Sequence, residues 1–125
     1  MINPYPTEAA GVSPANLAYI GDAVYELLAR LYGLRQGGNT NDLHRHTVSM
    51  VCAQAQRRDA EALMAELSEE ELLWFKRGRN AKITLRAHTE AASYRIATGL
   101  ETLFGWLYLS GRTDRIVELF TRLHA

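Results

Sequence analysis

Apolar residues recur at helical spacing in the first third of the chain. They are Leu17, Ile20, Val24, Leu27, Leu28 and Leu31. This repeat predicts a helix from about Pro14 to Gln36 with most of its surface facing a core. Ser13 is a good N-cap, and Pro14 suits the first helical position because its missing N–H is harmless there. The pair Gly37-Gly38 predicts the end of the helix.

A second helical region is predicted to start at a cap on Thr40 or Asn41. Its apolar face comprises Leu43, Val48, Val51, Ala55, Ala60, Leu63, Met64 and Leu67. Because the segment is so long, we expect a break within it. Cys52 lies between Val51 and Ala53, so it is expected to be a small buried side chain in a helix interior. As the single cysteine, it excludes an internal disulfide and fits a reducing compartment.

Ser68 and Glu71 form a capping-box pattern that opens the next helix. This helix carries Leu72, Leu73 and Phe75 and then reaches a basic segment at residues 77–82. Residues 83–88 resemble a connection. Trp74 and Trp106 are expected in a core or an interface rather than as platforms on which bases stack.

Two further helices complete the predicted set. One opens at Thr89-Glu90 and runs to Gly111, and the last opens at Thr113-Asp114. The inward positions are Ala97, Leu100, Leu103, Phe104 and Leu107 in the first, and Ile116, Val117, Leu119, Phe120 and Leu123 in the second. No window shows the alternation of a strand. The pattern therefore predicts an all-α single domain over residues 1–125, with residues 1–12 as an extended N-terminal arm.

Composition narrows the possible partners. Fourteen lysines and arginines balance fourteen aspartates and glutamates, so the formal net charge is zero. Binding of nucleic acid would then depend on a local basic patch, not on a global field. The N-terminal residues lack the basic start and following apolar run of a signal peptide, so we expect none. No apolar run approaches the length of a membrane span.

Two carboxylates interrupt apolar helical segments. Asp22 lies between Ile20 and Ala23, and Glu101 is flanked by Leu100 and Leu103. An aspartate in an apolar stripe is costly to bury unpaired. The two acids could meet at one edge of the bundle and hold Mg²⁺, which prefers carboxylate oxygens and water. Alternatively, each acid could cap a helix or pair with an arginine, and spacing alone does not decide between these readings.

The densest basic segment contains Arg77, Arg79 and Lys82, with Asn80 as an additional amide donor. Gly78 within it would let the backbone approach a ligand closely. Arginine forks match phosphate oxygens, which favours phosphate contacts. The alternative is a solvated helix end, where cations interact favourably with the helix dipole.

Several motifs together resemble the ribonuclease III family. The segment 17–24, with sequence LAYIGDAV, resembles the signature helix of its catalytic domain, and the segment 101–109 resembles its second acidic motif. The segments 77–82 and 94–99 resemble motifs of the Mini-ribonuclease III group, the short bacterial members without a double-stranded-RNA-binding domain. The resemblance extends from about Asn16 to Leu119 and implies a ribonuclease III-like helical bundle.

The resemblance also implies an activity and a site. We expect a Mg²⁺-dependent endoribonuclease that cleaves double-stranded RNA, leaving 5′-phosphate and 3′-hydroxyl ends, with Asp22 and Glu101 as catalytic metal ligands. The RNA contacts would come from the basic segment. The expected substrate is precursor 23S ribosomal RNA in a bacterial-type cytoplasm or a plastid, with possible association with the ribosome or a ribosomal protein. The alternative is a non-catalytic RNA-binding or ribosome-associated module on the same fold.

The resemblance further implies a homodimer, in which Tyr19 inserts into the partner. Two departures from the longer enzymes are visible. Those enzymes carry a glutamate where this chain has Ala18 and an aspartate where it has Thr98. Fewer charges should weaken metal affinity and leave more coordination positions to water and substrate. Both departures agree with the Mini-ribonuclease III pattern.

Overall fold

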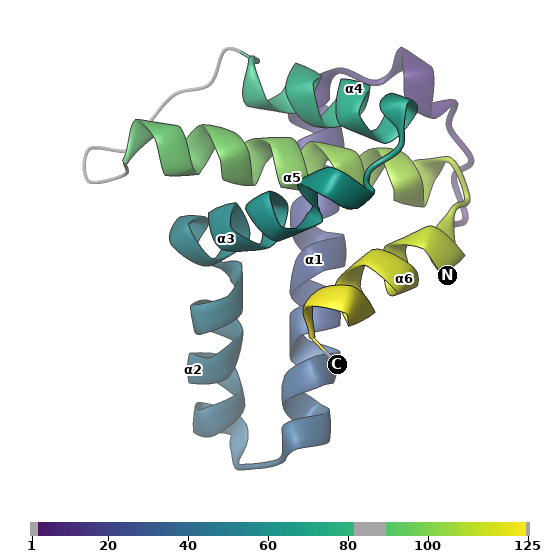
Figure 1. The fold of residues 1–125 in the computed structure, drawn as a ribbon. Helices are drawn as coiled ribbons and strands as arrows, with labels where there is room; N and C mark the ends of the chain where they lie inside the picture. The colour runs from purple at the N-terminus through teal and green to yellow at the C-terminus, as the bar shows by residue number, and fades with distance from the viewer. Residues whose placement is uncertain (1–2, 82–89, 125) are drawn as a thin grey trace.

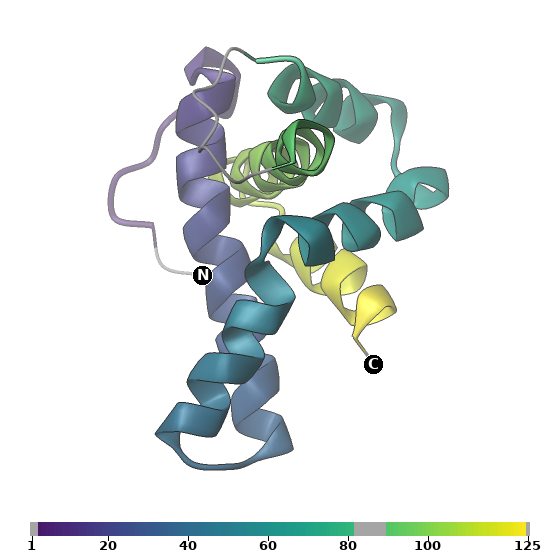
Figure 2. The same ribbon diagram turned by 90° about the vertical axis from the view of Figure 1, so that its left-hand side faces the viewer.

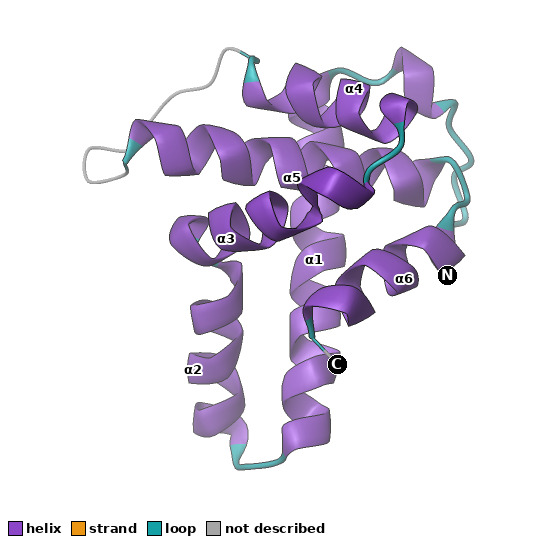
Figure 3. Ribbon diagram, viewed as in Figure 1, coloured by secondary structure: helices purple, strands orange, loops and turns teal. Residues whose placement is uncertain are grey.

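A computed structural model describes residues 3–81 and 90–124 of the chain. Within these residues the secondary structure is helical, without strands (Figure 3), which confirms the predicted fold class. The elements are η1 (Ala9–Gly11), α1 (Pro14–Gln36), α2 (Thr40–Val51), α3 (Ala53–Leu63), η2 (Met64–Glu66), α4 (Glu69–Arg79), α5 (Ala91–Leu109) and α6 (Thr113–Leu123).

Helix α5 is the centre of the fold. It packs against α1, α3, α4 and α6 (Figure 1). Its predicted inward residues are all buried, and Leu103, Phe104 and Leu107 have no exposed surface. Glu101 therefore lies on the helix that contacts four others.

Helices α1 and α2 form a hairpin whose closed end extends away from the other helices (Figure 2). Gly37 and Gly38 make the turn with φ angles of 90° and 115°, a region that glycine enters without steric cost. The predicted caps at Thr40 or Asn41 were wrong. Asn39 caps α2. Its side chain accepts a hydrogen bond from the Asp42 N–H, and the Asp42 carboxylate accepts one from the Asn39 N–H.

The expected break in the second helical region occurs at Cys52. This residue is extended, with φ −66° and ψ 157°, and it separates α2 from α3. The side chain of Cys52 is exposed, so the prediction of a buried cysteine was wrong. The break changes the direction of the chain, and α3 packs against α5.

Some apolar positions predicted to face the core are exposed. Leu27 and Leu31 on α1 are 46% and 53% exposed, and Val48 and Val117 are similarly exposed. Helical periodicity identified the apolar stripe but could not show that the packed face is narrower. Trp74 and Trp106 are buried, as predicted for core residues. The N-terminal arm is extended only in part, since residues 9–11 form a 3₁₀ turn with Ala9 buried.

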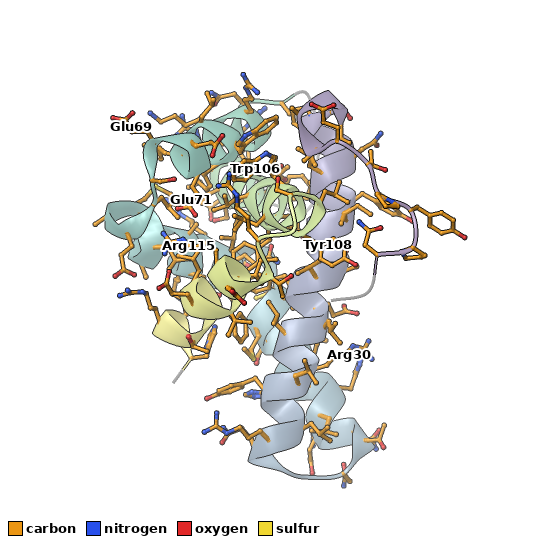
Figure 4. The ribbon with its side chains drawn as sticks, turned by 90° about the vertical axis from the view of Figure 1, so that its right-hand side faces the viewer. Arg30, Glu69, Glu71, Trp106, Tyr108 and Arg115 are labelled. Carbon is orange, nitrogen blue, oxygen red and sulfur yellow. The ribbon has the colours of Figure 1, made fainter. Side chains whose placement is uncertain are left out.

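The start of α4 is fixed by the predicted capping box. Ser68 accepts from the Glu71 N–H, and the Glu71 carboxylate accepts from the Ser68 N–H. Arg115 on α6 donates to both Glu71 oxygens, at 2.7 and 2.9 Å (Figure 4). This ion pair ties the first turn of α4 to α6.

Candidate active site

Two glycines bring α1 and α5 into backbone contact. A Cβ atom added to Gly21 would lie 1.7 Å from the carbonyl oxygen of Glu101. One added to Gly105 would lie 1.9 Å from the carbonyl oxygen of Leu17. Only residues without a Cβ permit so close a crossing. The crossing places Asp22, which follows Gly21, next to the turn of α5 that carries Glu101.

The carboxylates of Asp22 and Glu101 lie within hydrogen-bonding reach of each other. Asp22 is exposed, whereas Glu101 is partly buried beneath it. Burial, followed by the hydrogen bond and charge of Asp22, raises the pKa of Glu101 to about 9. Asp22 and Glu101, from helices distant in sequence, thus form an acid pair at the edge of the bundle.

A third polar side chain that the sequence analysis missed borders this pair. Gln56 on α3 is only 2% exposed, and its amide is close enough to the Glu101 carboxyl to lower the pKa that burial raises. The sequence does contain a signal. Gln56 precedes Ala60 by four residues and Leu63 by seven, so it occupies a polar place on the buried face of α3.

The two positions that depart from the longer family members present no acid to the pair. Ala18 is 8% exposed and offers only a methyl group. The Thr98 hydroxyl donates to the carbonyl oxygen of Tyr94 at 2.9 Å, one turn back on its own helix. Among the described residues, no group of three or more His, Cys, Asp or Glu side chains could hold a metal ion.

The acid pair nevertheless fits a divalent cation. Two carboxylates in close contact repel each other when both are ionised, and a raised pKa is the expected consequence. A hard cation between them would remove that repulsion, and carboxylate oxygens are the ligands that Mg²⁺ prefers. Asp22 is open to water and substrate, so further coordination positions are accessible.

The basic segment lies at the C-terminal end of α4. The guanidinium of Arg77 stacks over Trp74 at 4.6 Å, and Trp74 stacks on Trp106 with ring centroids 5.7 Å apart. Arg79 lies over Phe75 and donates to the side chain of Asn80. Lys82 lies outside the described residues. The aromatic stacking holds Arg77 in a defined position while its side chain stays exposed.

Gly78 serves a different contact from the one considered for it. A Cβ atom at this position would lie 2.2 Å from Thr102 Oγ1 and 3.1 Å from the Cα of Gly99. The close approach is therefore to α5 and not to a ligand. It packs the basic end of α4 against the part of α5 that carries Glu101.

Tyr19 lies on the outer side of α1 and is 77% exposed. It begins an exposed apolar stripe along α1. The stripe consists of Tyr19, Ala23, Leu27, Leu31 and Leu34. None of the described helices is long and apolar enough to cross a membrane.

Comparisons with known proteins place the chain in one family. Residues 15–112 match the family described as Ribonuclease III domain. The chain is 42% identical to Mini-ribonuclease 3 of Clostridium tetani over 111 residues, which are 86% of this chain and 74% of that protein. It is 40% identical to Mini-ribonuclease 3 of Thermosynechococcus vestitus, covering 98% of this chain and 80% of the relative.

A crystal structure of a protein from Fusobacterium nucleatum has the same fold. The two superpose with a TM-score of 0.86 at 28% sequence identity, covering 94% of this chain and 98% of the other. The family match spans both Asp22 and Glu101, and the relatives match across most of their own length. The chain therefore belongs to the ribonuclease III family, in its Mini-ribonuclease III group, and is an endoribonuclease.

Proposed function

We propose that this chain is a Mg²⁺-dependent endoribonuclease whose site for cleaving double-stranded RNA is the Asp22–Glu101 pair. The observation that carries the proposal is the meeting of these two carboxylates at the glycine crossing of α1 and α5. Within a ribonuclease III fold, this pair is where hard-cation chemistry and RNA phosphates can come together. Cleavage of double-stranded RNA itself follows from membership of the family.

Asp22 and Glu101 would hold the cation directly or through water. A bound Mg²⁺ supplies positive charge that polarises a phosphoryl oxygen, activates water and stabilises the leaving 3′ oxygen. Glu101 must give up its proton to act as a ligand, and its raised pKa makes this step dependent on pH. Asp22 faces solvent, so its carboxylate is accessible to a cation and to water. The products would carry 5′-phosphate and 3′-hydroxyl ends.

The basic end of α4 would hold the duplex. Arg77, Arg79 and Asn80 present guanidinium and amide donors, and Lys82 adds a charge outside the described residues. Since A-form RNA is recognised mainly through phosphates and 2′-hydroxyls, such donors suit contacts that are independent of sequence. The stacking of Arg77 on Trp74 reduces the freedom that this side chain would lose on binding.

A homodimer would present two such sites to one duplex. The apolar stripe on α1 is exposed, and Tyr19 is an aromatic side chain of the kind that anchors interfaces. A two-fold interface on α1 would also place the two acid pairs in a symmetric relation, which matches the approximate two-fold symmetry of duplex RNA. We include this dimer in the proposal.

The proposed physiological role is the maturation of precursor 23S ribosomal RNA in the cytoplasm. The support is the similarity to Mini-ribonuclease 3 of several bacteria. Association with the ribosome or with a ribosomal protein would be consistent with this role.

The test uses a duplex RNA incubated with and without Mg²⁺. We compare the wild-type chain with Asp22→Asn and Glu101→Gln, which keep nearly the same shape and remove only the charge. Cleavage by the wild type should require Mg²⁺, and each variant should lose most of it while its circular dichroism and melting temperature remain those of a folded protein. Wild-type turnover in either variant would remove that residue from the site.

A further inference from the structure

Gln56 is a buried polar side chain without an evident structural role. Its Nε2 atom is fully enclosed and forms no hydrogen bond in this structure. An unsatisfied buried amide destabilises the folded protein, so an apolar residue would be expected there if packing alone mattered. Two other enclosed side-chain nitrogens of the described residues share this condition, in His46 and His124. Only Gln56 borders the acid pair.

The neighbour of the Gln56 amide is the Glu101 carboxyl. Glu101 therefore has an acid on one side, Asp22 from α1, and an amide donor on the other, Gln56 from α3. A hydrogen bond from this amide to one carboxylate oxygen would favour the ionised form and fix the rotation of the carboxylate. The other oxygen would then be available to a cation shared with Asp22.

The break at Cys52 explains how α3 reaches this position. Cys52 N–H closes α2 by donating to the carbonyl oxygen of Val48, and Gln56 N–H opens α3 by donating to the carbonyl oxygen of Cys52. Gln56 thus lies in the first turn of α3, at the point where that helix meets α5. Arg57, the next residue, donates to Ser93 on α5 and pairs with Glu90 before it, which holds the two helices together.

The two positions where the longer family members carry acids do not orient the Glu101 carboxylate in this way. Ala18 has no polar atom, and the Thr98 hydroxyl is engaged by the carbonyl oxygen of Tyr94. Removing an outer group that orients a metal ligand commonly lowers metal affinity by about 10–100-fold. A site with only two carboxylates depends more on such a group than a site with four.

We propose that Gln56 is a positioning residue of the active site, whose amide orients the Glu101 carboxylate so that it and Asp22 bind one divalent cation together. This inference rests on the proposed function, because it takes the acid pair to be the metal site. It adds a group from a third helix to that site, one that acts through Glu101 and does not touch the substrate.

The decisive experiment measures binding of Mn²⁺ to the RNA-free protein by isothermal titration calorimetry. Gln56→Met keeps the length and volume of the side chain but removes the amide. We expect Mn²⁺ affinity to fall about tenfold or more, the range found when outer-shell partners of metal ligands are removed. Gln54→Met is the matched control, since Gln54 lies half a turn earlier and is exposed, and its affinity should equal that of the wild type.

Two further measurements separate positioning from packing. In EDTA the melting temperature of Gln56→Met should not fall, because the variant removes an unpaired buried amide, and its affinity for duplex RNA should be unchanged. A purely structural residue would instead lower both together with Mn²⁺ binding. If Gln56→Met does not fold, Gln56→Asn replaces it, because the shorter side chain withdraws the amide while staying polar. Wild-type Mn²⁺ affinity, or a loss that merely follows a lowered melting temperature, would overturn the proposal.

The failure of this inference is distinguishable from failure of the proposed function. If the wild type cleaves duplex RNA with Mg²⁺ but Gln56→Met binds Mn²⁺ normally, only the role of Gln56 is wrong. If Glu101→Gln abolishes Mn²⁺ binding and Gln56→Met weakens it, but no duplex RNA is cut, the positioning role stands and the proposed function does not.

Discussion

Gly21 on α1 and Gly105 on α5 face each other at a crossing where neither residue can carry a Cβ atom. An atom added to Gly21 would come within 2.8 Å of the Gly105 backbone nitrogen, besides overlapping the Glu101 carbonyl. The separation of the two helices, and with it the separation of the Asp22 and Glu101 side chains, is therefore set by two hydrogen atoms. The geometry of the acid pair depends on residues that have no functional group.

Gly21→Ala should accordingly affect both stability and the site. Forcing a methyl group into a closely packed contact typically costs about 1–3 kcal/mol, because backbone rather than a flexible side chain must move. We expect a lower melting temperature, and weaker Mn²⁺ binding in the protein that remains folded. Gly11→Ala is the control, since a Cβ there meets no atom within 4 Å. Equal stability of the two variants would contradict the tight crossing.

The sequence predicted most of the helices because their periodicity and caps are local properties. In the capping box, for example, the side chains of Ser68 and Glu71 each accept a hydrogen bond from the backbone N–H of the other, within one turn. The cap at Asn39 was missed because the local pattern does not choose between neighbouring capping residues. Thr40 and Asn41 are equally good caps, and only the preceding glycine turn decides at which residue α2 begins.

The acids of the candidate site were found in sequence, but their contact was not readable from it. Asp22 and Glu101 are 79 residues apart, and which helix faces meet depends on packing over the whole bundle. Gln56 was missed because a single polar residue on an apolar face has many structural explanations. Its relation to Glu101 becomes visible only when α3 is placed against α5.

The pH dependence of stability should reveal the acid pair in metal-free protein. Because the folded pKa of Glu101 is about 9, the native state holds this proton more tightly than the unfolded chain, where a glutamate has a pKa of about 4.3. The contribution to stability is complete below the unfolded pKa and is lost as pH rises toward the folded pKa. The slope is at most about 1.4 kcal/mol per pH unit.

Urea denaturation in EDTA between about pH 5 and pH 9 measures this effect. The free energy of unfolding should fall more steeply with pH in the wild type than in Glu101→Gln, which has no proton to lose at this position. Added Mg²⁺ should stabilise the wild type increasingly as pH rises, because the cation replaces the proton. Parallel curves for the two proteins would mean that Glu101 titrates normally.

The ion pair between Glu71 and Arg115 should contribute to stability and not to catalysis. Burial raises the pKa of Glu71, but hydrogen bonds from Arg115 and from the Ser68 backbone outweigh it and hold that pKa below its usual value. Glu71→Ala leaves Arg115 without this partner and removes half of the capping box, so we expect a loss of about 3 kcal/mol. The stabilisation by the Glu71–Arg115 ion pair should be present near neutral pH. It should disappear in acid, as the pH falls through the pKa of Glu71 in the folded protein. Chemical denaturation at neutral pH and at about pH 3, compared with wild type, tests this expectation.

Arg77 and Arg79 should act through RNA affinity. Replacing either with alanine should weaken binding to most duplex sequences and reduce the slope of log affinity against log salt by about 1 for each lost phosphate contact. Arg35→Ala is a matched control, because Arg35 is exposed in the last turn of α1. The closed end of the α1–α2 hairpin lies away from α4 (Figure 1). Fluorescence anisotropy at several salt concentrations gives the slopes. Unchanged slopes for both variants would favour the alternative, that this segment is a solvated helix end without RNA contacts.

Tyr19→Ala should weaken dimerisation and duplex cleavage together. Tyr19 is 77% exposed in the single chain, and it heads the apolar stripe that continues along α1 through Leu27. An aromatic anchor buried at an interface is typically worth about 2 kcal/mol or more on truncation. The two-fold axis would use the contact twice, so the dimer should dissociate at substantially higher protein concentrations in the variant. Tyr5→Ala is the control, since Tyr5 is 81% exposed but lies in the N-terminal arm outside the stripe. Sedimentation velocity over a concentration series decides the matter: a wild-type protein that remains a 14.0 kDa monomer and still cuts both strands would rule out the dimer.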